Sequence, residues 1–162
     1  MRDKKKLQVL VLGIGNEILQ DEGLGIHAAR MLEKMNLPEE VEVIAGGTAG
    51  LALLPLLKEK DYLIVIDAVN ARTEPGAIFK FKPDQVDVYP LEYQLSFHQL
   101  GLYDVLRVAQ LLGDCPDTTI FGMQPGTISW GMELTPPIAD NLPRLVELVV
   151  EEINKILGKG PH

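Results

Sequence analysis

The sequence is poor in cysteine. It has one, Cys115, among 162 residues, which excludes an internal disulfide bond and any metal site built from several cysteines. A metal site in this chain would therefore have to use oxygen and nitrogen ligands.

Clustered positive charge is also scarce. Asp and Glu number 23 against 15 Lys and Arg, which gives a net charge of −8, and the basic run is confined to residues 4–6. Because phosphate contacts need clustered Lys and Arg, we expect neither nucleic acid nor an anionic membrane as the main partner.

Long apolar runs are missing as well. No stretch approaches the roughly 20 apolar residues of a membrane span, and the N-terminus lacks the apolar core of a signal peptide. We therefore expect a cytoplasmic protein without membrane insertion. Hydrophobic residues still make up 46% of the chain, enough for a sizeable core. We predict a single domain over residues 1–162, with flexible tails at 1–6 and 158–162.

Apolar runs and amphipathic stretches alternate along the chain. The runs predict parallel strands at 7–12, 41–45, 61–67 and 118–123, and the alternating segment 76–82, which carries two lysines, predicts an antiparallel edge strand. Helical spacing predicts helices at 25–35, 51–58, 98–112 and 138–157. Pro143 stands inside the last helix, where a proline can cut it in two. The fold class that follows is an α/β three-layer sandwich with a mostly parallel, five-stranded twisted sheet and helices on both faces.

A glycine-rich loop follows the first predicted strand. Gly13 and Gly15 allow a sharp turn, and Asp21 with Glu22 is expected to meet the unpaired N–H groups at the start of the next helix. The third glycine of a dinucleotide fingerprint is replaced here by isoleucine, so we set a nucleotide site aside. The loop instead projects Asn16 and Glu17 from the strand's carboxyl end.

Three separate side chains are predicted to meet at this edge of the sheet. Glu17 follows the first strand, Asp67 ends the third, and His98 stands in the first turn of a helix that returns from the same edge. Each has an ordinary structural explanation: a solvated carboxylate, a backbone cap, a partly buried histidine. Together they form a plausible three-ligand set for Zn²⁺, Ni²⁺ or a related divalent ion. A carboxylate beside the ion could accept a proton from attacking water, while the ion polarises a scissile carbonyl.

Serine and cysteine nucleophiles fit less well. Cys115 follows the helix that begins near His98, and about fourteen residues at ~1.5 Å each place it some 20 Å away. Ser96 is two residues from His98, so on an extended segment their side chains point to opposite faces.

Several short motifs are spread from about residue 7 to residue 150. They are Gly13-x-Gly15-Asn16-Glu17, Asp21-Glu22-Gly23-x-Gly25, Gly46-Gly47-Thr48, Asp67-Ala68, Ser96-x-His98-x-x-Gly101, Gln124-Pro125 and Trp130-Gly131. In this order and spacing they make the chain resemble the hydrogenase maturation endopeptidases. The resemblance implies an enzyme that removes the C-terminal tail of a [NiFe] hydrogenase large-subunit precursor after nickel insertion.

The resemblance also implies roles for particular residues. By position, Glu17, Asp67 and His98 become the metal ligands and the catalytic groups. The ion is nickel brought by the precursor, with zinc or cadmium as substitutes, and the precursor's own cysteines would complete its coordination. The substrate cleft is expected to include Asn16, Gly46, Gly47, Thr48, Gln124 and Trp130. From the sequence alone, Trp130 either fills the rim of the core or presents its ring to a bound peptide.

One position departs from the family pattern. The family usually has Asp directly before its Gly-Gly-Thr, and this chain has Ala45. Two mechanisms stay open: the ion polarises the peptide or its water, or the ion only positions the tail while a carboxylate acts as base, as in aspartic-type endopeptidases. Ala45 also keeps open a metallochaperone or scaffold that binds the precursor without cutting it, and a weaker third option is a hydrolase of another substrate.

Overall fold

In the computed structural model of the chain, residues 6–46, 50–83 and 97–158 are described, apart from the side chains of residues 50, 51, 97–100 and 103. Within these ranges the elements are, in chain order, strand β1 (Val9–Gly13), 3₁₀ helix η1 (Gln20–Gly23), helix α1 (Leu24–Glu33), strand β2 (Val41–Ala45), 3₁₀ helix η2 (Gly50–Leu53), helix α2 (Leu54–Leu57), strands β3 (Tyr62–Ala68) and β4 (Ile78–Phe81), helix α3 (Phe97–Leu112), strand β5 (Asp117–Met123) and helix α4 (Pro136–Ile156).

The described strands form a single sheet in the order β2-β1-β3-β5-β4. β1 pairs in parallel with β2 and β3, β3 pairs in parallel with β5, and β4 runs antiparallel to β5 at the edge. This arrangement confirms the predicted α/β class, including its antiparallel edge strand.

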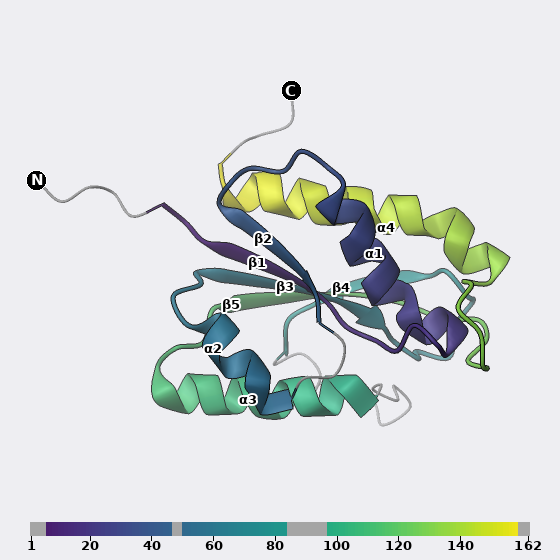
Figure 1. The fold of residues 1–162 in the computed structure, drawn as a ribbon, viewed down its shortest axis with the longest axis horizontal. Helices are drawn as coiled ribbons and strands as arrows, with labels where there is room; N and C mark the ends of the chain where they lie inside the picture. Colours follow the sequence, from purple (N-terminus) through teal and green to yellow (C-terminus); the bar gives the residue numbers. More distant parts are fainter. Residues whose placement is uncertain (1–5, 47–49, 84–96, 159–162) are drawn as a thin grey trace, which may run out of the picture.

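Helices cover both faces of the sheet (Figure 1). α1 and α4 pack on one face and α2 and α3 on the other, so β1 is buried along its whole length. Successive side chains of a strand point to opposite faces, and a strand covered on both sides therefore needs apolar residues at every position. Two separate cores result. The first takes Val9, Val11, Ile64 and Ile66 from the central strands, and the second takes Leu10, Leu12, Leu63 and Val65.

The start of α1 lies directly against the end of β3. A side chain at Gly25 would collide with the backbone oxygens of Ile14 and Ile66. Glycine lets the two backbones approach this closely, and the close packing sets the position of η1 and of the loop before it.

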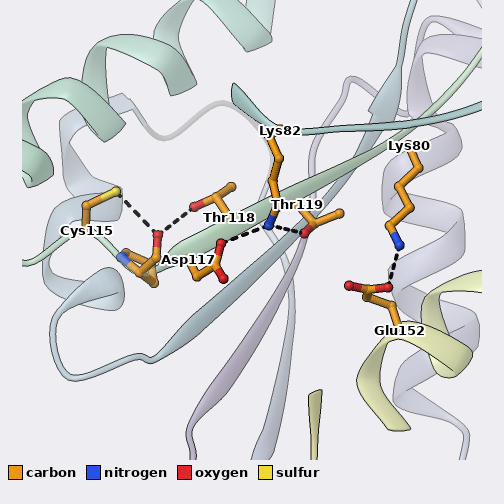
Figure 2. A network of polar contacts seen from close by, with 8 residues as sticks. Lys80, Lys82, Cys115, Asp117, Thr118, Thr119 and Glu152 are labelled. Atoms are coloured by element: carbon orange, nitrogen blue, oxygen red, sulfur yellow. Dashed lines mark hydrogen bonds and ion pairs between the residues drawn. The ribbon is translucent and has the colours of Figure 1, made fainter. Parts of the chain in front are cut away.

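The edge strand β4 is tied down by its lysines (Figure 2). The Nζ atom of Lys80 lies 2.7 Å from a carboxylate oxygen of Glu152 on α4. Lys82, just after the strand, donates to Asp117 at 2.8 Å and to the hydroxyl of Thr119 at 2.9 Å. Charged side chains on an edge strand also disfavour pairing with another sheet, as predicted.

Two helices differ from their predicted form. α4 continues through Pro143 without a break, so this proline does not divide it. Pro143 and Ala139, whose carbonyl loses its helical partner, both face solvent, where water can take the place of the missing hydrogen bond. The segment predicted as a helix over 51–58 is a short 3₁₀ turn followed by one turn of α-helix. Within the described residues, no helix combines the length and apolar character that crossing a membrane requires.

Candidate active site at the carboxyl edge of the sheet

The direction of the strand order changes between β1 and β3. From β1 the chain moves to β2 on one side, and it then returns to β3 on the other side of β1. Open α/β sheets bind their ligands outside the carboxyl ends of the strands at such a point. Gly13, the last residue of β1, pairs with Ile66, so Asp67 is the first residue of β3 beyond the end of β1.

Asp67 is completely buried at this position. Its Oδ1 atom accepts a hydrogen bond from the backbone N–H of Ala68 at 2.8 Å. A buried carboxylate is costly unless it is well bonded, and this one stands where the fold places ligand sites. Of the predicted site residues, Asp67 is therefore the one whose location fits the prediction most directly.

Glu17 is held by a residue that the sequence argument did not include. Arg30 of α1 donates to both carboxylate oxygens of Glu17, at 2.6 and 3.1 Å. This hydrogen-bonded pairing with Arg30 lowers the pKa of the Glu17 carboxyl below its usual value. The pair is partly exposed, with 33% of the Glu17 side chain and 48% of the Arg30 side chain accessible. No local spacing rule links a loop residue to one thirteen positions later, so the partner was not predictable from the pattern.

Asp21 does not cap the helix as predicted. The α1 cap has no side-chain hydrogen bond, and the wholly buried Asp21 carboxylate reaches instead to the loop between β5 and α4, residues 124–135. Its oxygens accept hydrogen bonds from the N–H groups of Gly126, Thr127 and Thr135 at 2.8 to 2.9 Å, and from the Thr135 hydroxyl at 2.5 Å. Asp21 therefore joins the loops that follow β1 and β5.

Glu22 is an acidic residue of this loop that the sequence argument left without a site role. It is half-buried, and its carbonyl oxygen accepts a hydrogen bond from the N–H of Asn16 at 3.3 Å. A side chain at Gly15 would strike that same oxygen, so Glu22 is folded back onto the end of β1. Glu22 stands three residues before Gly25, and Gly25 lies against β3. This position makes Glu22 a candidate site residue.

His98 lies in the first turn of α3, as predicted. Its side chain is outside the described part, and so are Gly47 and Thr48 of the predicted cleft. Among the described residues, no group of three His, Cys, Asp or Glu side chains is placed to hold a metal ion. The set of Glu17, Asp67 and His98 therefore stays a prediction.

Three predicted cleft residues have clear structural contacts. Gln124 is nearly buried, and its side chain accepts from the N–H of Ala71 at 2.7 Å and donates to Asn70 at 3.2 Å. It thereby holds the segment that follows Asp67. Asn16 bonds the N–H of Ile18 through its side-chain oxygen. Gly46 donates to the carbonyl of Gly13 at 2.8 Å. These contacts shape the loops at the carboxyl edge.

The structure excludes one of the two roles considered for Trp130. With 81% of its surface exposed, it does not fill the rim of the core. It stands on the 124–135 loop, beside the segment that carries Ile18.

Cys115 lies at the opposite edge of the sheet, just before β5 (Figure 2). Burial raises the pKa of its thiol, which keeps it in the unreactive neutral form. A pocket of about 380 Å³ opens beside it, lined by Lys82, Pro83, Leu106, Gln110, Cys115, Pro116, Asp117 and Thr118. This edge holds the amino ends of the parallel strands, so the thiol is remote from Asp67.

Comparison with known proteins identifies the family of this chain. A family model described as hydrogenase maturation protease matches residues 26–152. The chain is 40% identical over 152 residues to the hydrogenase expression/formation protein HupD of Rhodobacter capsulatus, across 92% of this chain and 72% of that protein. It is 34% identical over 152 residues to the hydrogenase 2 maturation protease of Escherichia coli (strain K12), across 92% of each chain. It also superimposes on the structure of the hydrogenase maturating endopeptidase HybD from E. coli with a TM-score of 0.83 and 32% identity, covering 92% of this chain and 93% of that one.

The chain has an open, mostly parallel α/β sheet, a class of protein that binds its ligands outside the carboxyl ends of its strands. The chain belongs to the hydrogenase maturation protease family. Its resemblance on sequence motifs is thereby confirmed, and the activity to be explained is that of a protease.

Proposed function

We propose that this protein removes the C-terminal tail from the large-subunit precursor of a [NiFe] hydrogenase, and that it does so only after nickel has been inserted. The observation that carries the proposal is the buried carboxylate of Asp67 at the point where the strand order reverses, in a chain that belongs to this protease family. The nickel ion is part of the substrate in this scheme. Oxygen and nitrogen donors suit it, and they are the donors that this chain can offer.

The proposed ligands are Asp67, His98 and one carboxylate of the loop between β1 and α1. Glu17 is the loop ligand implied by the sequence resemblance. Its two oxygens already contact the guanidinium of Arg30, and a divalent cation placed there would be repelled by that positive charge. Glu22 belongs to η1, which packs against β3. We therefore favour Glu22 as the loop carboxylate and retain Glu17 as the alternative.

The chain's own groups would act in a simple order. The ligands hold the nickel-bearing end of the precursor, and this fixes the peptide bond beside the sheet edge. A carboxylate, for which Asp67 is the candidate, accepts the proton of the attacking water. Because Asp67 is fully buried here, contact with the substrate requires its surroundings to open. A mechanism in which nickel polarises the carbonyl uses the same residues.

The test is cleavage of purified precursor in nickel-loaded and nickel-free forms, followed by mass spectrometry. We expect the wild-type chain to shorten only the loaded form, and His98→Ala to shorten neither. Glu17→Gln and Glu22→Gln form a matched pair: loss of cleavage in the second alone would identify Glu22 as the ligand, and loss in the first alone would restore Glu17. If cleavage depends on neither nickel in the precursor nor the His98 side chain, ion recognition is ruled out.

The same measurement separates a protease from a metallochaperone or scaffold. Ala45, at the end of β2 and paired with Gly13, stands where the family usually has Asp, and this departure is the reason to test the alternative. A chaperone would bind the precursor and leave its mass unchanged, whereas a protease releases the tail.

A further inference from the structure

Exposed apolar side chains gather on two loops at the carboxyl edge. Of the large hydrophobic residues that the described part leaves exposed, four lie on these loops: Ile18 at 44%, Ile128 at 53%, Trp130 at 81% and Met132 at 60%. Single exposed hydrophobic residues are ordinary, but a group of them marks an interaction site.

Backbone hydrogen bonds place three of the four residues side by side. The N–H of Gln20 donates to the carbonyl of Gly131 at 2.8 Å, and the N–H of Gly131 donates to the carbonyl of Ile18 at 2.9 Å. Gly131 bridges in parallel with Leu19 and stands between Trp130 and Met132 in the chain, so Ile18 lies on the segment paired with the one that carries Trp130 and Met132. We call Ile18, Trp130 and Met132 the apolar loop patch.

Three features beneath this patch are energetically costly: a buried charge, a strained backbone and unpaired polar atoms. Asp21 is a buried carboxylate that accepts hydrogen bonds from the 124–135 loop. Gln20 adopts a left-handed backbone with φ of 49°, which is unfavourable for a residue other than glycine. Among the described residues, the Oε1 atom of Gln20 and the Nε2 atom of His27 are buried without a hydrogen-bond partner. Such costs in one place are typical of a surface kept for function.

The patch shares the segment between β1 and α1 with the two candidate loop ligands. Ile18 directly follows Glu17, and Glu22 lies four residues further on in the same loop. A protease must touch its substrate here, so the occupant that fits is the precursor itself, through an apolar surface next to its cleavage point. Trp and Met are enriched in the centres of protein interfaces, where buried aromatic anchors carry much of the affinity.

We propose that the apolar loop patch is a docking surface for an apolar region of the hydrogenase large-subunit precursor. This inference rests on the proposed function for the identity of the partner. It adds a recognition site outside the proposed nickel ligands, held in a fixed shape by Asp21 before the substrate arrives. A preformed surface loses less conformational freedom on binding than a loop that must first become ordered.

The experiment compares Trp130→Ala and Met132→Ala with Leu111→Ala, which removes a side chain that is 87% exposed on α3. The probe is the purified nickel-loaded large-subunit precursor of the [NiFe] hydrogenase from the same organism. Binding is followed by surface plasmon resonance with Asp67→Asn in the background, and cleavage by KM and kcat without it. We expect roughly tenfold weaker binding for Trp130→Ala, a higher KM with kcat unchanged, and no change for Leu111→Ala.

Each outcome bears on one proposal or the other. Unchanged binding and KM in both patch variants would overturn the docking surface while leaving the protease intact. Binding that depends on Trp130 in a protein that never shortens the precursor would support the docking surface and reject the proposed cleavage. A wild-type dimer in sedimentation velocity that Trp130→Ala dissociates, with precursor binding unchanged, would make the patch a contact between copies of this chain and overturn the inference.

Discussion

Asp117, at the edge of the sheet where the parallel strands begin, and Asp21 and Asp67, at the edge where they end, are held in opposite ways. At the edge with the amino ends of the strands, Asp117 is 59% exposed and pairs with Lys82 at the surface. At the carboxyl edge, Asp21 and Asp67 are entirely buried and bonded to backbone N–H groups. Exposed pairs contribute little and cost little, whereas buried carboxylates are expensive to keep. The comparison indicates that Asp21 and Asp67 are held more tightly than Asp117.

The largest difference between the edges is expected in catalysis. Asp67→Asn preserves the size of the side chain but removes its charge, so we expect precursor cleavage to fall by about 10²- to 10⁴-fold, the usual range for a lost acid–base group. Asp117→Asn makes the same chemical change at the other edge and should leave the rate as it is. Rates come from the release of the tail over time. A comparable loss in both variants would show that the edges do not differ in function.

The next largest difference between the two edges is expected in their contribution to the free energy of unfolding. Asp21→Asn puts an amide among the three N–H groups and the hydroxyl that now donate to the carboxylate, so donors lose their acceptors. We expect a loss of roughly 3 kcal/mol in the free energy of unfolding. Asp117→Asn should cost under about 1 kcal/mol, since its pair with Lys82 is exposed. Urea titrations of the two variants give both values, and equal losses would contradict the comparison.

The smallest effect on catalysis is expected from substituting Cys115. Because burial raises the pKa of this thiol, less thiolate is present at pH 8 than in an unperturbed cysteine, and iodoacetamide should label it more slowly than free cysteine, with the rate still rising at higher pH. Cys115→Ser should leave tail removal within about twofold of wild type, because the residue is remote from Asp67. Rapid labelling at pH 7 that also stopped cleavage would contradict both statements.

The sequence predicted what depends on local pattern. The apolar run before Asp67 identified β3 and its end, and the alternating segment with Lys80 identified the antiparallel edge strand. Parallel topology then placed the carboxyl ends of β1 and β3 together, which is why the position of Asp67 at this edge could be predicted.

Contacts between distant segments escaped this reasoning. Asp21 looked like a helix cap because acidic residues favour helix starts, but its partners lie 105 to 114 residues later in the chain. Arg30 lies on the helix after Glu17 and binds it through a loop whose path no periodicity reveals. The burial of Gln124 beneath Ala71 has the same origin. Side-chain pairing across loops depends on their three-dimensional course.

The absent side chain of Gly25 has a consequence for how this protein can change. Only the hydrogen atom of Gly25 fits between the start of α1 and Ile66 of β3, so even a methyl group would shift the helix and carry Glu22 with it. In a library of variants randomised across residues 13–25, substitutions of the glycines should thus inactivate the protein as often as substitutions of the acidic residues. The close approach of the α1 and β3 backbones restricts substitutions in this loop as strongly as the chemistry of its acidic residues does.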